Sequence, residues 1–190
     1  MVDKAQDHGL RAILNVYWSA YGGWRAVLRS RFFWLSIVLL IITAHFWVTD
    51  TWWEQVLSVM PNLLGFTLGG FAVFLGFGDE KFKSLIAGED EDMPGETSPY
   101  MEMCSGFLHF VVVQCLALIT SVVAKATAFE FAGCLKPISV WLGQYRWLGD
   151  MFGYWLFLYG ICLAMAAAIG IFRVAFWFDK YKTANRDDTQ

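Results

Sequence analysis

Residues 56–78 read VLSVMPNLLGFTLGGFAVFLGFG, and none of these 23 consecutive positions carries a charged side chain. The run ends abruptly at the charged triplet DEK, residues 79–81. A helix needs about 20 apolar residues to cross about 30 Å of hydrocarbon. The sequence therefore predicts that this stretch spans a lipid bilayer as a helix.

The same stretch carries small residues at helical spacing. Gly65, Gly69, Ala72 and Gly76 are four, three and four residues apart, which places them on one face of a helix. In lipid the hydrophobic effect does not drive helices together, so close packing over small residues takes its place. We interpret this face as a packing seam, either within the chain or between copies of it.

The composition of the whole chain supports a membrane protein. Its 190 residues are 57 % hydrophobic and 16 % charged, against about 25 % charged in soluble domains. A net charge of −3 without a basic face gives no indication of nucleic-acid binding. Charged residues are scattered through the first 31 positions, so we expect no cleavable signal peptide.

Three further apolar stretches complete the predicted fold, at residues 32–48, 103–124 and 151–177. We expect an all-α polytopic membrane protein with four transmembrane helices, a 79–102 loop on one side and a 125–150 loop on the other. The last span offers a second small-residue face at Gly160, Ala164 and Ala168. Within the 125–150 loop, Pro137 and the apolar spacing after it predict a short separate helix.

The N-terminal arm, residues 1–31, has apolar residues at helical spacing with arginines between them. This pattern is typical of an amphipathic helix that lies in the membrane surface. The alternative is a helix that packs against its own protein. We expect Gly22 and Gly23 to interrupt the helix, and four side chains to contact lipid phosphates: Arg11, Arg25, Arg29 and Arg31.

Lysine and arginine counts predict the orientation. The N-terminal arm, the 79–102 loop and the tail that begins at Arg173 hold 11 of them, whereas the opposite side holds 3. Positive residues accumulate on the cytoplasmic side, so both termini should be cytoplasmic. Tryptophans near the predicted span ends agree with this arrangement, because aromatic rings favour the headgroup region.

Few polar residues fall inside the predicted spans, and the main ones are Asn62, Thr67 and Gln114. They can line a pore, or they can form hydrogen bonds between helices. No Asp or Glu lies deep in a span, which argues against a proton-coupled pump. His45 and His109 fall at different predicted depths, so a shared haem is not favoured. We expect no cofactor.

Neither catalytic motifs nor metal-binding motifs are present. The chain contains no nucleophile elbow, phosphate-binding loop or HExxH sequence. The four cysteines lack CxxC spacing, which disfavours a zinc site or a disulfide framework. We therefore expect a protein that is not an enzyme and that holds no metal.

The 79–102 loop contains five acidic residues within positions 88–96, together with two prolines and two glycines. This composition favours disorder. The loop is either a solvated linker or a docking segment for a basic cytoplasmic protein. In the second case the candidate docking residues are Asp79, Glu80, Lys81, Lys83, Glu89, Asp90, Glu91 and Asp92.

Residues 61–82, PNLLGFTLGGFAVFLGFGDEKF, resemble the second span of small four-pass membrane proteins from bacterial and prophage gene neighbourhoods. Some of these belong to antiphage defence systems, among them the membrane subunit of the Kiwa system. The resemblance implies an oligomer of the bacterial inner membrane. The sequence does not determine the number of copies, and we take a tetramer as a guess. It also implies sensing of membrane disturbance, recruitment of a cytoplasmic partner, or, as the alternative, an ion channel lined by the second span.

Overall fold

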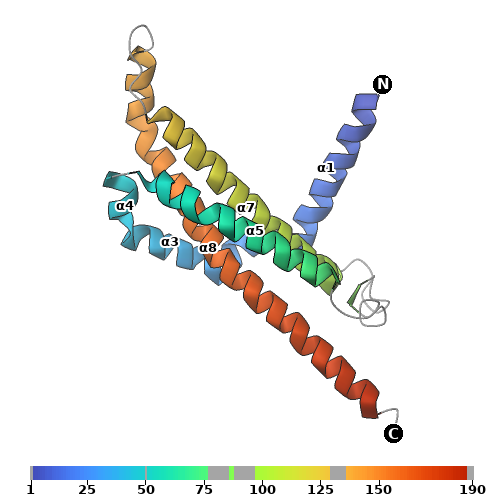
Figure 1. Cartoon of the computed structure of the whole chain (residues 1–190). Coiled ribbons are helices and arrows are strands. Elements are labelled where there is room, and N and C mark those ends of the chain that lie inside the picture. The colour runs from blue at the N-terminus through green and yellow to red at the C-terminus, as the bar shows by residue number, and fades with distance from the viewer. Residues whose placement is uncertain (1, 50, 77–85, 88–96, 129–135, 188–190) are drawn as a thin grey trace. The chain divides into compact units, whose positions relative to one another are not determined.

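The computed structural model describes residues 2–49, 51–76, 86–87, 97–128 and 136–187, without the side chains of residues 2–8, 49, 136–145 and 184–187. All seven elements in this part of the chain are helices, which confirms the all-α prediction. In chain order (Figure 1) they are α1 Val2–Tyr21, α2 Gly23–Arg29, α3 Arg31–Ile42, α4 Ala44–Thr49, α5 Trp52–Gly76, α7 Pro99–Thr127 and α8 Lys136–Asp187.

Three of these helices are long and apolar enough to cross a membrane. They are α5, with 25 residues, α7, with 29 residues, and the 38-residue portion Arg146–Thr183 of α8. Only 17 % of the most apolar part of α5 is buried inside the structure, so most of that surface faces outward. The chain is therefore a membrane protein by helix length and composition, and three of the predicted spans correspond to these helices.

The stretch 32–48 differs from the prediction of one uninterrupted span. Helix α3 ends at Ile42, Thr43 forms a turn, and α4 begins at Ala44. The Thr43 hydroxyl donates to the Leu39 carbonyl at 2.7 Å, a bond that competes with regular helix geometry. Nearby, the Trp47 indole donates to the Leu40 carbonyl at 3.2 Å. The 12 residues of α3 rise only about 18 Å, less than the hydrocarbon thickness.

Helix α8 contradicts the prediction of a separate helix in the 125–150 loop. Residues 136–187 form one helix without a break before the fourth predicted span. No proline follows Pro137 in α8, and an ion pair at i,i+4 spacing joins Arg146 to Asp150 across the predicted boundary. Near the N-terminus the predicted interruption is confirmed, because the chain turns at Gly22 and Gly23, with φ of +90° and +61°.

The chain forms two compact units. The first unit comprises Met1–Arg29, Gly70–His109 and Ala166–Gln190. Its described core consists of Phe74, Met103, Phe107 and Val174. Aromatic rings, among them Trp177, pack around these four side chains.

The second unit comprises Ser30–Gly69 and Phe110–Met165. Val56, Met60 and Ala117 are completely buried in it, so its parts of α5 and α7 pack without gaps there. The hydroxyl of Ser36 accepts the indole N–H of Trp155 at 3.1 Å. Because the donor lies on α8 and the acceptor on α3, this bond holds the short helix α3 against the longer one.

Candidate functional site

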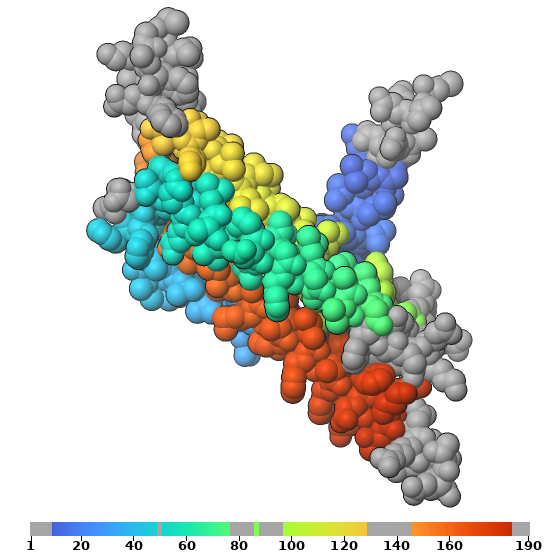
Figure 2. Space-filling view, in the orientation of Figure 1, coloured from blue at the N-terminus to red at the C-terminus, as the bar shows by residue number. Residues whose placement is uncertain are grey.

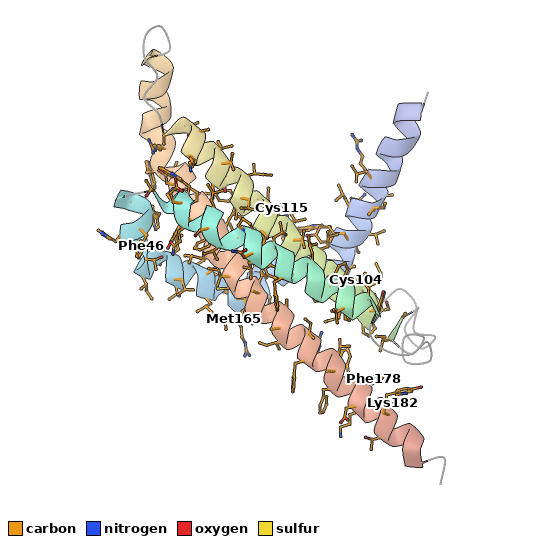
Figure 3. All side chains as sticks on the ribbon, viewed as in Figure 1. Phe46, Cys104, Cys115, Met165, Phe178 and Lys182 are labelled. Atoms are coloured by element: carbon orange, nitrogen blue, oxygen red, sulfur yellow. The ribbon has the colours of Figure 1, made fainter. Side chains whose placement is uncertain are left out.

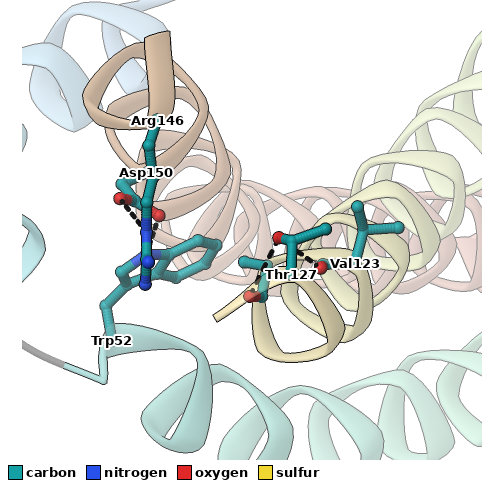
Figure 4. A network of polar contacts seen from close by, with 6 residues as sticks. Trp52, Val123, Thr127, Arg146 and Asp150 are labelled. Carbon is teal, nitrogen blue, oxygen red and sulfur yellow. Dashed lines mark hydrogen bonds and ion pairs between the residues drawn. The ribbon is translucent and has the colours of Figure 1, made fainter. Parts of the chain in front are cut away.

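A polar network lies at the start of α5 in the second unit (Figure 4). The indole N–H of Trp52 donates to Oδ1 of Asp150 at 2.8 Å, and Nε of Arg146 lies 3.6 Å from Oδ2 of the same carboxylate. The guanidinium of Arg146 also lies over the ring of Trp53, 5.6 Å from its centroid. Trp52 is only 3 % exposed, so this network is a fixed contact between α5 and α8.

Gly153 makes that contact possible. A Cβ at this position would lie 2.3 Å from Cη2 and 2.9 Å from Cζ2 of Trp52. The indole ring therefore lies directly against the α8 backbone, where any side chain would displace it. The role of Gly153 could not be predicted from the sequence, because a single glycine in an apolar helix does not indicate which ring packs on it.

Helix α7 joins the same end of the second unit. Nζ of Lys125 lies 2.9 Å from Oε1 of Glu54, and both side chains are about half exposed. Figure 4 also shows the end of α7, where the hydroxyl of Thr127 donates to the carbonyls of Val123 and Ala124 and closes the last turn. Exposed ion pairs contribute little to stability, so the buried tryptophan is the stronger connection at this end.

A buried polar pair lies within the second unit. Nε2 of Gln114 donates to the hydroxyl of Thr67 at 3.0 Å, and that hydroxyl donates to the Leu63 carbonyl at 2.7 Å. Gln114 is completely buried, and its Oε1 has no hydrogen-bond partner among the described residues. Of the two interpretations of these residues, the structure shows a hydrogen bond between helices α5 and α7.

Asn62 does not join this pair. Its side chain is exposed, and its amide donates to the Ser58 carbonyl of its own helix at 3.2 Å. Thr67, in contrast, is 4 % exposed and faces α7. The two side chains therefore lie on different faces of α5.

The predicted seam on α5 lies on the outer surface of the chain. Gly65, Gly69, Ala72 and Gly76 are exposed, and a Cβ added at any of the three glycines would meet no described atom within 4 Å. Two exposed polar residues extend the seam toward the helix start at the same spacing. We call the whole set the α5 stripe: Ser58, Asn62, Gly65, Gly69, Ala72 and Gly76. The surface of α5 is in plain view in Figure 2.

The second small-residue face has a different environment. Gly160 is buried, and its added Cβ would lie 2.6 Å from Cε of Met60 and 3.8 Å from Cγ of Gln114. Ala164 is half-buried and Ala168 is exposed. Only the first member of this face therefore packs closely within the chain, and it does so against α5 and α7.

The arginines proposed to contact lipid phosphates are all exposed: Arg11, Arg25, Arg29 and Arg31. Leu10, Ile13 and Leu14 of α1 are exposed as well, which leaves this apolar surface for lipid to cover. The end of α1 instead packs on the protein. The Tyr17 hydroxyl lies 2.9 Å from Nδ1 of His109, and the Tyr21 ring stacks on the imidazole.

This aromatic contact was missed by the sequence analysis, which predicted neither tyrosine as a partner of His109. Burial, together with a smaller effect of the neighbouring Tyr21, raises the pKa of Tyr17 to about 12. The tyrosine is therefore neutral near pH 7 and can share its hydroxyl hydrogen with the imidazole. The last turn of the arm therefore packs on the protein, as in the second of the two expected arrangements.

The candidate docking residues of the 79–102 loop, from Asp79 to Asp92, lie outside the described residues. Within the described part of the chain, Cys104, Cys115 and Cys162 are free thiols, and the first two project from α7 (Figure 3). The same part contains no cluster of side chains suited to hold a metal ion. Comparisons of the chain with protein-family models, with characterised proteins and with solved structures find no match.

Proposed function

We propose that this chain is the oligomeric inner-membrane sensor or effector subunit of a bacterial antiphage defence-type system, with no catalytic activity of its own. In this proposal the α5 stripe joins copies of the chain, and cytoplasmic segments engage a partner protein. The observation that carries the proposal is the α5 stripe, which is exposed although its residue types suit close helix packing.

The polar residues of the α5 stripe support the proposal that a second copy of the chain covers it. Asn62 is exposed on a helix apolar enough to cross a membrane. Its amide uses one donor on the Ser58 carbonyl, so its remaining polar atoms need partners that hydrocarbon does not provide. A second copy of α5 supplies such partners, and the neighbouring Gly65 and Gly69 allow the two backbones to approach closely.

The proposal includes a four-pass topology in which α3 and α4 together form the first membrane segment. Their 18 residues, 12 in α3 and 6 in α4, contain no charge after Arg31. An even number of passes places both termini on one side, and the lysine and arginine distribution favours the cytoplasmic side. This places the 79–102 loop with its acidic residues where a cytoplasmic partner can reach it.

Support for a defence role comes from the resemblance of residues 61–82 to small four-pass proteins of antiphage systems. A small membrane body with charged cytoplasmic segments suits signalling from the bilayer to a soluble partner. A sensor of this kind must change its assembly or its exposed surface when the membrane changes. The α5 stripe is the surface through which such a change would pass between copies.

Assembly can be tested with substitutions that leave the single chain intact. We expect Gly65→Leu and Gly69→Leu to reduce the oligomer mass of detergent-purified protein to that of the monomer. A Cβ at either position meets no described atom within 4 Å, whereas the larger side chain would separate the copies. Gly106→Leu is the matched control, since its Cβ also meets nothing within 4 Å but lies on α7. Oligomers that survive both α5 changes would refute the seam.

A channel is the second candidate, and exposed Asn62 and Ser58 favour it, because a polar stripe repeated around a symmetric ring can line a water-filled path. In planar bilayers a channel would show discrete conductance steps, and Asn62→Leu would reduce them. A purified oligomer that never conducts, with or without an applied membrane potential, would eliminate the channel and leave the sensor proposal standing.

A further inference from the structure

We infer that the C-terminal part of α8 binds an anionic phospholipid. The binding surface is one side of the helix, which we call the α8 lipid face: Ile169, Phe172, Arg173, Phe176, Trp177 and Lys180. At 100° per residue these six side chains fall within an arc of about 140°. The inference rests on α8 crossing the membrane and goes beyond the proposed defence role.

The apolar part of the α8 lipid face is uncovered. Ile169 is 59 %, Phe172 is 72 % and Phe176 is 51 % exposed. Their spacing of three and four residues makes a continuous strip along one side of the helix. In the membrane a strip of this kind is covered by a hydrocarbon chain, so its occupant must have an apolar part.

Two cations border this strip without a carboxylate partner in the described structure. The guanidinium of Arg173 lies 5.0 Å from the centroid of the Trp177 ring, and its Nη2 lies 3.8 Å from Sδ of Met103. Nζ of Lys180 lies 5.7 Å from the centroid of the Phe176 ring. A ring and a thioether are weak acceptors, so most N–H groups of both cations remain available to an anion.

The position of Arg173 is set by the protein. Trp177 packs on the core of the first unit, next to Val174 and Phe74. The guanidinium rests on this ring and on Met103, a buried member of the same core. Its planar N–H groups suit the oxygens of a phosphate. Lys180 lies two turns further on, about 10 Å along the axis, within the span of one phospholipid headgroup region.

A phospholipid fits this face better than an acidic segment of the chain does. Carboxylates of residues 88–96 can neutralise the cations, but this segment has few apolar groups to cover Phe172. Asp179 lies about 120° from Arg173 and about 100° from Lys180 around the helix, so it borders Phe172 at the edge of the face and pairs with neither cation. A lipid with an anionic headgroup neutralises the two cations with its phosphate and covers the apolar strip with its acyl chains. The anionic inner leaflet contains such lipids.

The experiment uses the purified full-length chain in detergent micelles, titrated with phosphatidylglycerol or phosphatidylcholine of identical acyl chains. Native mass spectrometry counts the lipids that remain bound. We expect at least a tenfold preference for phosphatidylglycerol. Arg173→Gln and Lys180→Gln should each weaken its binding about fivefold, the effect of one charge near an anionic surface. Phosphatidylcholine binding should stay unchanged in both variants.

Lys182→Gln is the matched control. It removes the same charge from the same helix, but Lys182 lies about 160° from Lys180 around the helix, over the Phe178 and Tyr181 rings. We expect less than a twofold change there. Equal losses in all three variants would show unspecific attraction and overturn the inference, as would a wild-type chain without headgroup preference. A tenfold gain in phosphatidylglycerol affinity after Glu89, Asp90, Glu91 and Asp92 are changed to amides would show that the acidic segment occupies the face.

The same spectra report the oligomer mass. Loss of headgroup preference with an intact oligomer therefore refutes the lipid site alone. A monomeric wild-type chain that still prefers phosphatidylglycerol refutes the seam alone.

Discussion

Replacement of Gly153 by alanine should break the contact between α5 and α8 at the polar network. The new methyl group would lie 2.3 Å from Cη2 and 3.1 Å from Cζ3 of Trp52. Because that ring is 3 % exposed and closely surrounded, it cannot move aside without a shift of its neighbours. Movement of the ring also pulls the indole N–H away from Asp150, to which it donates at 2.8 Å.

The magnitude follows from three contributions to the free energy of unfolding. Overpacking costs about 1–3 kcal/mol, and loss of a hydrogen bond to a charged group costs about 1.5–3 kcal/mol. In the opposite direction, alanine favours the helix over glycine by about 0.5–1 kcal/mol. The net expectation for Gly153→Ala is a destabilisation of about 1.5–5.5 kcal/mol.

The assay is unfolding of the purified protein in mixed micelles with increasing sodium dodecyl sulfate, followed by circular dichroism. Gly149→Ala is the control, because it lies one turn earlier on α8 and its added Cβ meets no described atom within 4 Å. It should stabilise the protein by about 0.5–1 kcal/mol. In a Trp52→Ala background, where the ring is absent, Gly153→Ala should no longer lower the free energy of unfolding. Equal stability of the two alanine variants would refute the reasoning.

Thr67→Val should destabilise the protein by about 1 kcal/mol in the same assay, because it leaves the completely buried amide of Gln114 without its acceptor. Gln114→Met should be neutral or stabilising, because the Thr67 hydroxyl keeps its hydrogen bond to the Leu63 carbonyl of its own helix. Equal losses of stability in the two variants would contradict this expectation. Lys125→Gln should cost less than about 1 kcal/mol, since Lys125 and Glu54 are half exposed, and a larger loss would assign that ion pair a role the structure does not show. Tyr17→Phe should remove a phenol that ionises near pH 12 in an absorbance titration at high pH. Because the pKa of Tyr17 in the folded protein is raised above 10, its contribution to stability is fully present below pH 10 and lost as the pH rises through 12. If Tyr17→Phe and the wild type unfold along the same curve at alkaline pH, this contribution is absent.

The sequence alone predicted the features that depend on local hydrophobicity. The apolar runs at 56–78, 103–124 and 151–177 each correspond to a helix able to cross a membrane, because a bilayer requires length and low charge from every such segment. The interruption at Gly22 was also predictable, since adjacent glycines accept positive φ where other residues do not.

Features that depend on a single side chain or on distant partners escaped prediction. The apolar stretch 32–48 is divided at Thr43, where α3 ends. The hydrogen bond from the Thr43 hydroxyl to the Leu39 carbonyl cannot be predicted from hydropathy. Gly153 and Tyr17 matter through residues far away in the sequence, Trp52 and His109. The exposure of the α5 stripe was undetermined as well, because small residues at helical spacing suit contacts within a chain and between chains equally.

Crosslinking of the α5 stripe in native membranes tests whether this surface joins two copies of the chain. We propose Gly65→Cys in a background in which the four native cysteines are alanine, exposed to a membrane-permeable oxidant, with Gly106→Cys as the control. We expect a disulfide-linked dimer for Gly65→Cys and none for Gly106→Cys. If Gly65→Cys stays monomeric while its thiol reacts freely with a small maleimide, the stripe faces lipid or water and no second copy covers it.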